Sequence, residues 1–382
     1  MGGADRFCVE MIKALARNHE NELFVICEKM PKKFSVEIED YDVKVFETGL
    51  SGINSGKTLR AARGWAQVPN LGRKIAEILA RIDPEIINPH NFPDVFHAAY
   101  YKAHKKHDVR VSWFCHEPCR LFYDSEVFKY LPLSEKVFFA IYSDLFVPLD
   151  KKCIRLLVDT IGSNSKYTAT LVREIYGRSS QVVYPGVDTS RFKPVNSELK
   201  YSLDCDFSVL SVGRVDFSHK NLQVIPMVLR KIANRHDIKW VHIGDGPDAS
   251  KLDRIAKNYG VREHLVFKKE VTENELVQYY SSANVVVYTP LREPFGLVPL
   301  EAMACETPVI ASKQGGTSET ILNGKTGLLV NLDSISEITQ AILYILENED
   351  VARKMGILGR NRVDSMFTLE KTVKDFCSFV YS

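Results

Sequence analysis

Short apolar runs alternate along the chain with longer segments in which apolar residues recur at helical spacing. Residues 4–18 carry Phe7, Met11 and Leu15 at that spacing, and the apolar run 22–27 follows directly. Such a run is typical of a buried strand. Because the same order repeats as far as residue 184, the pattern predicts an α/β domain with a parallel sheet.

A second series of alternating elements begins after a stretch of low apolar content. This stretch, residues 191–206, contains Pro194 and is predicted to be a linker between two domains. The second series occupies residues 207–367, and a final helical pattern covers residues 368–382. We therefore expect an N-terminal domain at residues 1–190 and a C-terminal domain after the linker.

The length of 382 residues suits two domains, and 45% hydrophobic residues can supply a core for each. A formal net charge of +2 gives no general attraction to nucleic acid. The eight cysteines lack zinc-finger spacing, which indicates free thiols in a reducing cytoplasm. No apolar run is long enough to cross a bilayer, and the chain opens with an amphipathic segment rather than a signal peptide. The sequence therefore predicts a cytoplasmic protein.

Two glutamates flank the start of a predicted helix in the second series. Glu293 follows an apolar run, and Glu301 lies about one turn inside a helix that begins near Gly296. The amides of Phe295, Gly296 and Leu297 lie at the amino end of that helix, where unpaired N–H groups and the helix dipole favour an anion. Carboxylates accept hydrogen bonds from paired hydroxyls, so the segment predicts a nucleotide-sugar site. An ordinary acidic helix start is the alternative.

Arg214 and Lys220 follow the first predicted strand of the second series, in a turn that precedes a helix. Two cations at the carboxyl end of a parallel strand can hold a diphosphate, the arginine through a bidentate contact and the lysine as a mobile charge. There they would stabilise a departing nucleoside diphosphate. A solvated basic loop is the alternative for such a pair.

His116 follows a predicted strand of the first series and is its strongest polar candidate. A histidine there can serve in proton transfer, although a lone histidine after a strand is more often structural or solvated. Asn88 and His90 end the preceding predicted strand and could approach the same cleft.

No sequence pattern predicts an essential metal ion. The pairs Asp40 with Asp42 and Asp204 with Asp206 precede strands, whereas ligand-bearing loops of open α/β sheets follow them. Residues 244–247 match a dinucleotide-binding fingerprint only in part, because its third glycine is absent. We therefore expect neither a metal nor a dinucleotide cofactor.

The stretch between residues 57 and 81 carries six cations against one acid. Interleaved apolar residues such as Leu59 and Trp65 make it a candidate contact for an anionic membrane or a lipid-linked acceptor. The favoured alternative is a helix that packs its apolar face on the sheet and keeps its cations in water.

Taken together, these segments resemble retaining glycosyltransferase family four, whose members have the two-domain GT-B fold. The order and spacing of the matching segments extend over nearly the whole chain, whereas no single short motif is specific. The segments are, in chain order, residues 2–7, His116, residues 184–188, Arg214 with Lys220, residues 244–247, residues 293–301 and residues 315–319.

The resemblance implies two Rossmann-like, doubly wound domains that face a central cleft, with the helix at residues 368–382 packing back on the first domain. Similar proteins begin with a strand that runs into the Gly-Gly loop, whereas here Gly2 and Gly3 directly follow Met1. We therefore expect the first strand of the N-terminal sheet to be encoded upstream of Met1, so that this chain lacks a central element of that sheet.

The resemblance also implies roles for individual residues. His116, Glu293, Arg214 and Lys220 are expected at the reaction centre, and Glu301 is expected to hold the ribose hydroxyls. The remaining donor-binding residues implied by the matching segments are Gly2, Gly3, Gly244, Val271, Phe295, Gly296 and Leu297.

The implied activity is transfer of a hexose from a nucleoside-diphosphate sugar to a glycan or lipid-linked acceptor, with retention of the anomeric configuration. Residues 113–123 look like the corresponding stretch of mannosyltransferases in the family, so GDP-mannose is the first expected donor and a UDP-hexose the second. Attack from the leaving-group face is favoured over double displacement through Glu293. A sugar-nucleotide epimerase, a phosphorylase and a non-catalytic nucleotide-sugar-binding protein remain alternatives. A cytoplasmic enzyme with peripheral contact at the inner face of the membrane is expected.

Overall fold

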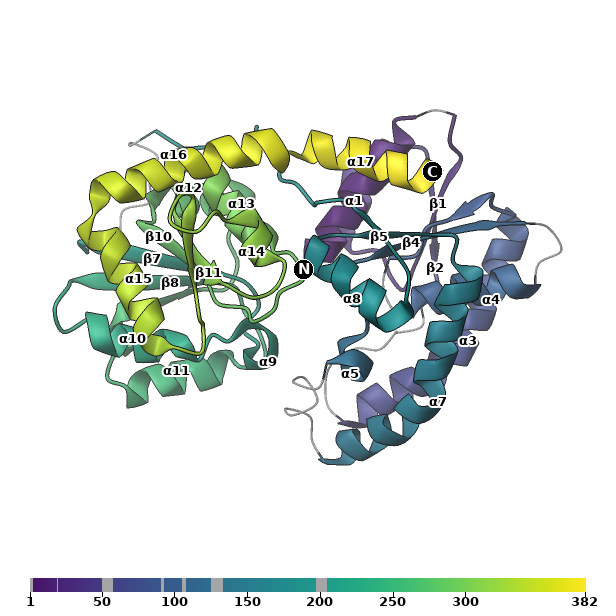
Figure 1. Ribbon diagram of the computed structural model, residues 1–382, viewed down its shortest axis with the longest axis horizontal. Coiled ribbons are helices and arrows are strands. Elements are labelled where there is room, and N and C mark those ends of the chain that lie inside the picture. Colours follow the sequence, from purple (N-terminus) through teal and green to yellow (C-terminus); the bar gives the residue numbers. More distant parts are fainter. Residues whose placement is uncertain are drawn as a thin grey trace. The chain divides into compact units, whose positions relative to one another are not determined.

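The computed structural model describes residues 3–18, 20–49, 58–90, 93–104, 108–124, 133–196 and 205–382 (Figure 1). The chain divides into two compact units, of which the first comprises residues 1–183 with 373–382 and the second residues 184–372. Helix α17 (Leu369–Tyr381) therefore begins in the second unit and ends in the first. The described parts of the segment expected to be a linker, residues 191–196 and 205–206, lie within the second unit.

The first unit contains two parallel sheets among its described residues. One has the two strands β1 (Leu23–Cys27) and β2 (Val43–Glu47). The other has four strands in the order β3-β4-β5-β6, namely β3 (Ile86–Ile87), β4 (Arg110–Cys115), β5 (Thr160–Ser163) and β6 (Gln181–Val182). In the described part of the chain no strand joins the two sheets. The helices are α1 (Gly3–Ala16), α2 (Lys32–Ile38), α3 (Thr58–Ile82), α4 (Asp94–His104), α5 (Arg120–Tyr123), α7 (Leu133–Leu157) and α8 (Lys166–Tyr176).

Strand β4 is buried on both faces, as its apolar sequence predicts. On one face Trp113 packs with Tyr176 of α8 at a ring-centroid distance of 5.6 Å. On the other face Phe114 stacks on Phe7 of α1 at 4.8 Å and contacts Phe376 of α17 at 5.5 Å. Helices α1 and α17 therefore cover the same face of the first unit's sheet.

The basic stretch at residues 57–81 falls largely in α3. Lys57 lies outside the described residues, as do the side chains of Leu59 and Trp65. Farther along the helix, Leu71 and Leu79 are buried while Arg73 and Arg81 are exposed. This part of the stretch is thus a helix with its apolar side packed against the protein. Among the described residues, no helix combines the length and apolar character needed to cross a membrane.

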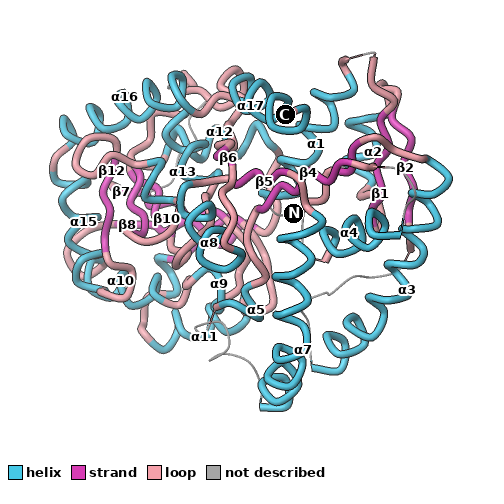
Figure 2. The backbone as a smooth tube through the Cα atoms, turned by 45° about the vertical axis from the view of Figure 1, so that its right-hand side comes forward, coloured by secondary structure: helices cyan, strands magenta, loops and turns pink. Residues whose placement is uncertain are grey.

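The second unit is built on a six-stranded parallel sheet with helices on both faces (Figures 1 and 2). The strand order is β12-β11-β10-β7-β8-β9. These strands are β7 (Phe207–Val212), β8 (Ile238–Ile243), β9 (Leu265–Lys268), β10 (Val285–Tyr288), β11 (Val309–Ser312) and β12 (Gly327–Val330). The helices are α9 (Phe217–Lys220), α10 (Val224–Ile232), α11 (Ala249–Asn258), α12 (Glu273–Ser282), α13 (Leu297–Ala304), α14 (Thr317–Thr320), α15 (Ile335–Glu347) and α16 (Glu349–Met366).

Alternate residues of the central strands enter two separate hydrophobic cores. Val209 and Val287 belong to the core that also contains side chains of α10, α11 and α15. Leu210 and Val286 belong to the opposite core, which contains side chains of α12, α13 and α16. Burial of both faces explains why these strands read as continuous apolar runs rather than as alternating ones. The predicted α/β fold with parallel sheets in two Rossmann-like units is confirmed.

The strand order reverses beside β7. From β7 the chain proceeds outward through β8 and β9, and it then returns to place β10 on the other side of β7. Loops that leave adjacent strands in opposite directions open a crevice at the carboxyl edge of such a sheet, where ligands of doubly wound folds bind. The loops that follow β7 and β10 therefore meet at this switch point.

Candidate functional site

The predicted reaction-centre residues of the second unit lie in the two segments that meet at the switch point. Arg214 and Lys220 follow β7, and Glu293 follows β10. Glu301 lies on α13, the helix that the second loop leads into. The parallel pairing of β10 with β7, in which Val286 is opposite Leu210, brings the two loops to the same edge of the sheet.

Lys220 and Glu293 contact each other directly. The Lys220 ammonium donates to both carboxylate oxygens of Glu293, at 3.1 and 2.9 Å. It also lies 6.0 Å from the centroid of the Tyr288 ring. The Thr289 hydroxyl donates to the Lys220 carbonyl at 2.5 Å, which ties the β7 loop to the end of β10. The structure therefore joins one predicted phosphate-binding cation to one predicted sugar-binding acid.

Arg214 is held differently. Its guanidinium donates to Asp216 at 2.5 Å, yet the arginine side chain is 55% exposed, against 24% for Lys220. Asp216 also accepts from the amide and hydroxyl of Ser218, at 3.1 and 2.6 Å. The hydrogen bond from His219, with those from Ser218 and the nearby positive charges, holds the pKa of Asp216 well below its usual range. A permanently ionised Asp216 thus anchors the arginine while leaving its outer side accessible.

A buried tyrosine orients Glu301 through a hydrogen bond. The Tyr280 hydroxyl of α12 donates to a carboxylate oxygen of Glu301 at 2.6 Å. The Tyr280 side chain is fully buried, and that burial, together with the charge of Glu301, raises the pKa of the phenol well above its ordinary value. The phenol therefore remains a hydrogen-bond donor to the carboxylate at every physiological pH.

The amino end of α13 begins at Gly296, which adopts φ 90° and supplies no side-chain cap. A Cβ at this position would lie 2.9 Å from the Tyr288 ring, so glycine is required by space as well as by conformation. Phe295, just before it, is buried, and Leu297 is the first helical residue. The predicted group of amides is therefore located at a helix amino end, where an anion is favoured.

A second loop supports the Glu293 segment from behind. The Gly316 amide donates to the Glu293 carbonyl at 2.8 Å, and the buried Thr317 hydroxyl donates to the Phe295 carbonyl at 3.1 Å. A Cβ on Gly316 would lie only 1.8 Å from the carbonyl oxygen of Pro294. The segment 293–295 is therefore positioned by backbone contacts that tolerate no side chain at Gly316.

Gly244 and Val271 lie outside the two loops at the switch point, after β8 and β9 respectively. A Cβ on Gly244 would lie 2.1 Å from the Gly213 carbonyl oxygen, so Gly244 lets the loop after β8 pack closely on the loop that carries Arg214. Val271 is partly buried and packs against the core that contains α12 and α13. Both remain predictions as donor-binding residues.

His116, Gly2 and Gly3 belong to the first unit. Gly2 lies outside the described residues, and Gly3 is the first residue of α1. His116 follows β4 and is 9% exposed, and its carbonyl accepts from Asn164 at 2.8 Å. Burial lowers the pKa of His116 well below its ordinary value, and a second histidine, His90, adds to this effect. His116 is therefore a neutral imidazole at neutral pH.

Sequence reasoning missed the residues that position the predicted ones. Asp216 could have been found, because an aspartate directly before a predicted helix is a frequent cap and here accepts from the Ser218 amide. Tyr280 gives no such signal, since its contact with Glu301 crosses from one helix to the next.

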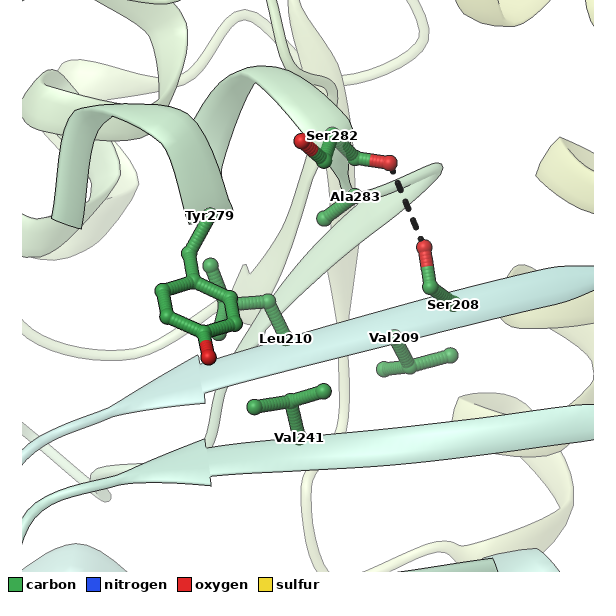
Figure 3. A pocket seen from close by; sticks show the side chains of 7 residues that line it. All are labelled: Ser208, Val209, Leu210, Val241, Tyr279, Ser282 and Ala283. Atoms are coloured by element: carbon green, nitrogen blue, oxygen red, sulfur yellow. Dashed lines mark hydrogen bonds between the residues drawn. The ribbon is translucent and has the colours of Figure 1, made fainter. Parts of the chain in front are cut away.

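The small pocket in Figure 3 is not part of this site. It lies by the amino end of β7, where the Ser208 hydroxyl donates to the Ser282 carbonyl at 3.3 Å. Arg214 follows the opposite end of the same strand. The residues that line the pocket are Ser208, Val209, Leu210, Val241, Tyr279, Ser282 and Ala283.

Two family models together match most of the chain. The model described as Glycosyltransferase Family 4 matches residues 1–191, which is half of the sequence. The model described as Glycosyl transferases group 1 matches residues 202–362, which include both loops of the switch point.

Curated relatives match the chain in part. The chain is 31% identical over 234 residues to the GDP-mannose-dependent alpha-(1-6)-phosphatidylinositol monomannoside mannosyltransferase of Mycolicibacterium smegmatis, a match that covers 56% of this chain and 61% of that protein. It is 28% identical over 245 residues to the Alpha-1,3/1,6-mannosyltransferase ALG2 of Homo sapiens, covering 59% and 58%. The chain thus spans less than two thirds of the length of these relatives.

A solved structure shows the fold over the full length. Alr3699/HepE of Anabaena, crystallised in complex with UDP and glucose, superimposes with a TM-score of 0.79 at 16% identity. The superposition covers 100% of this chain and 96% of that one. At 16% identity the likeness shows the fold alone.

Proposed function

This chain belongs to glycosyltransferase family 4 and has the GT-B fold, and from that premise we propose that it transfers a hexose from a nucleoside-diphosphate sugar to a glycan or lipid-linked hydroxyl acceptor. The observation that supports the proposal is the meeting of two cations, two carboxylates and a helix amino end at one switch point. A nucleotide sugar offers the complementary parts, namely a diphosphate between two groups rich in hydroxyls. An epimerase on the same fold would need the same donor contacts, whereas a phosphorylase would bind inorganic phosphate between the cations.

Each loop takes one part of the proposed donor. The exposed guanidinium of Arg214 and the ammonium of Lys220 bind the diphosphate, because both are cationic hydrogen-bond donors. Glu301, fixed by Tyr280, accepts hydrogen bonds from the ribose hydroxyls. Glu293 and the amides at the start of α13 bind the hexose and the adjoining phosphate.

The reaction we propose breaks the bond between the anomeric carbon and the β-phosphate oxygen, and the electron pair leaves with the nucleoside diphosphate. The acceptor hydroxyl attacks the anomeric carbon from the side of the leaving group, which retains the configuration. Its proton passes to the departing phosphate oxygen. Arg214, Lys220 and the helix dipole stabilise the negative charge that grows on that oxygen, the preorganised electrostatic effect that dominates many such reactions.

GDP-mannose is the first donor to test, with a UDP-hexose as the second. The mannosyltransferase relatives support mannose, and the first of them is by name GDP-mannose-dependent. That relative is also named for a phosphatidylinositol monomannoside, which supports a lipid-linked acceptor. An enzyme with such an acceptor would associate peripherally with a membrane surface.

A ligand-detected binding screen of nucleotide sugars, followed by mass analysis of products, tests this function. We expect saturable binding of one nucleoside-diphosphate hexose and, with a suitable glycan or glycolipid, a product heavier by one hexose. Turnover of the donor without acceptor would favour an epimerase, and a requirement for inorganic phosphate would favour a phosphorylase. Binding without any product from a broad acceptor panel would favour a binding protein. Absence of nucleotide-sugar binding would contradict the transferase, the epimerase and the binding protein.

Transfer is expected to persist in excess chelator. Two cations and a helix amino end already oppose the charge of the leaving group, so the proposed chemistry has no need of a divalent ion. Product formation with and without excess EDTA measures this directly. Loss of turnover in EDTA that manganese or magnesium restores would show the expectation to be wrong.

Tyr280→Phe is expected to raise the KM of the donor with little change in kcat. The substitution removes only the hydroxyl that fixes Glu301, and the ribose is remote from the bond being broken. Loss of a hydrogen bond to a charged group corresponds to about 1.5 to 3 kcal/mol, or roughly a tenfold to 150-fold rise in KM. Steady-state kinetics at saturating acceptor provide the measurement.

Tyr279→Phe is the matched control, because Tyr279 is also a buried tyrosine of α12 but lines the pocket away from Glu301. Its donor KM should stay within about twofold of the parent. Equal shifts in both variants would indicate a general loss of packing and would remove the positioning role from Tyr280.

A further inference from the structure

Three side chains with metal-binding chemistry converge in the first unit. Cys8 lies on α1, His90 follows β3, and His116 follows β4. The thiol sulfur and one ring nitrogen from each histidine all lie within 4.8 Å of one another. The donor site of the second unit uses neither Cys8 nor His90. Among the described residues this is the one group of at least three potential ligands that meets at such distances.

Hydrogen bonds fix which nitrogen of His90 can bind an ion. The Asn88 amide nitrogen donates to the Ser112 carbonyl, so the Asn88 oxygen faces His90. That oxygen lies 2.8 Å from Nε2 of His90, which must therefore carry the proton. Nδ1 of His90 is left as a lone-pair donor that points toward Nε2 of His116, 3.1 Å away. A hydrogen-bond acceptor that fixes the tautomer of the imidazole is typical of metal-binding histidines, and the Asn88 side-chain oxygen occupies that position here.

Aromatic side chains pack around the two imidazoles. Phe7 stacks on Phe114 at 4.8 Å and meets the His116 ring edge-on at 5.3 Å. Phe376 of α17 lies 5.9 Å from the His90 ring. These rings restrict the movement of both imidazoles, and Cys8 is half-buried beside them on α1. A partly dehydrated group of one thiol and two neutral imidazoles suits an ion that binds thiolate and imidazole strongly.

We propose that Cys8, His90 and His116 form a binding site for Zn²⁺, with the sulfur, Nδ1 of His90 and Nε2 of His116 as ligands and water in the fourth position. Thiolate and imidazole are the donors that zinc prefers. In a tetrahedral zinc site neighbouring ligand atoms lie roughly 3.3 to 3.5 Å apart, given zinc–ligand bonds of about 2.0 to 2.3 Å. The histidine pair at 3.1 Å is close to that spacing, whereas ligand atoms at the outer limit of 4.8 Å must approach each other when the ion binds.

Zinc binding releases one proton to solvent and involves no electron transfer. The Cys8 thiol releases its proton to solvent as the sulfur binds the ion. His116, whose Nε2–H donates to His90 in the metal-free protein, moves that proton to Nδ1 and presents its Nε2 lone pair. Because the ion takes Nε2 of the histidine expected at the reaction centre, we expect zinc to inhibit transfer rather than to support it.

Cobalt substitution tests the site without a sugar donor. The purified full-length protein, kept reduced, is titrated with Co²⁺ alone and monitored for the thiolate-to-cobalt charge-transfer band. We expect saturation at one ion per chain, reversal by one equivalent of Zn²⁺, and loss of the band in Cys8→Ala. Cys153→Ala is the matched control, because Cys153 is another half-buried free thiol in the first unit, outside the cluster. A band that survives in Cys8→Ala, or none in the parent protein, would overturn the proposal.

Alkylation of the parent protein gives a second readout that does not depend on a variant. Zn²⁺ should slow modification of Cys8 by iodoacetamide at least tenfold while leaving Cys153 unchanged, as read by peptide mass analysis. Equal rates at Cys8 with and without zinc would contradict the site. If zinc binds at Cys8 and transfer is unaffected, the metal site stands and the role expected for His116 is wrong, so the two ideas are separable.

Discussion

Lys220→Ala is expected to lower kcat/KM for transfer by roughly thirtyfold to a thousandfold. The variant removes a cation proposed to oppose the charge of the departing diphosphate, and loss of one such donor costs about 2 to 4 kcal/mol of transition-state stabilisation. The variant also leaves Glu293 without its two hydrogen bonds from the ammonium, so a fall in kcat should accompany the rise in KM. Arg214→Ala should produce a loss of similar size for the same reason.

Lys257→Ala serves as the control for charge alone. Lys257 is 64% exposed on α11 of the same unit and pairs with Asp253 of the same helix. Its removal changes the net charge by the same amount and should leave kcat/KM within about twofold. Unchanged kinetics in both Lys220→Ala and Arg214→Ala would remove the diphosphate role from these residues.

Gly316→Ala is expected to abolish most transfer although residue 316 has no side chain to offer the substrate. The added Cβ would lie 1.8 Å from the Pro294 carbonyl oxygen and 3.1 Å from Cα of Phe295, so backbone must move. The segment that moves carries Glu293 and leads into the amino end of α13. Misplacement of a site by about 1 Å can cost roughly a hundredfold in rate, and we expect a loss of at least that size.

Gly260→Ala provides the comparison for conformational cost. Gly260 has φ 65°, and an added Cβ there meets no atom within 4 Å. This variant should lose about 1 kcal/mol of stability from its left-handed backbone and keep its activity. Thermal melts establish that both variants are folded at the assay temperature. Full activity in a folded Gly316→Ala variant would show that the 293–295 segment is not part of the site.

The elements of the second unit could be predicted well because its strands are buried on both faces. The apolar run 284–288 corresponds to β10 at Val285–Tyr288, and the helix expected near Gly296 begins at Leu297. In a sheet that is buried on both faces, a short continuous apolar run is enough to predict a strand. The loops after β7 and β10 could likewise be identified from polar residues that follow such runs.

The contacts between those loops could not be predicted from the residues alone. Lys220 and Glu293 meet only because β10 is inserted beside β7, and the strand order leaves no local trace in the sequence. The expected linker is a further example. Its composition suggests a connector, but Arg360 donates to the carbonyls of Phe192 and Thr189 at 2.9 and 3.2 Å and holds the chain around residue 191 to the second unit.

The position of β7 in the centre of its sheet has a consequence for synthesis on the ribosome. One edge of β7 is covered as soon as β8 and β9 have emerged, but the other stays open until β10 emerges more than seventy residues after β7 begins. A nascent chain in that interval carries Lys220 without its acidic partner Glu293, next to an unpaired strand edge that can pair with other chains. The emergence of β10 and the loop that follows it thus covers the open edge of β7 and supplies Glu293 to the site.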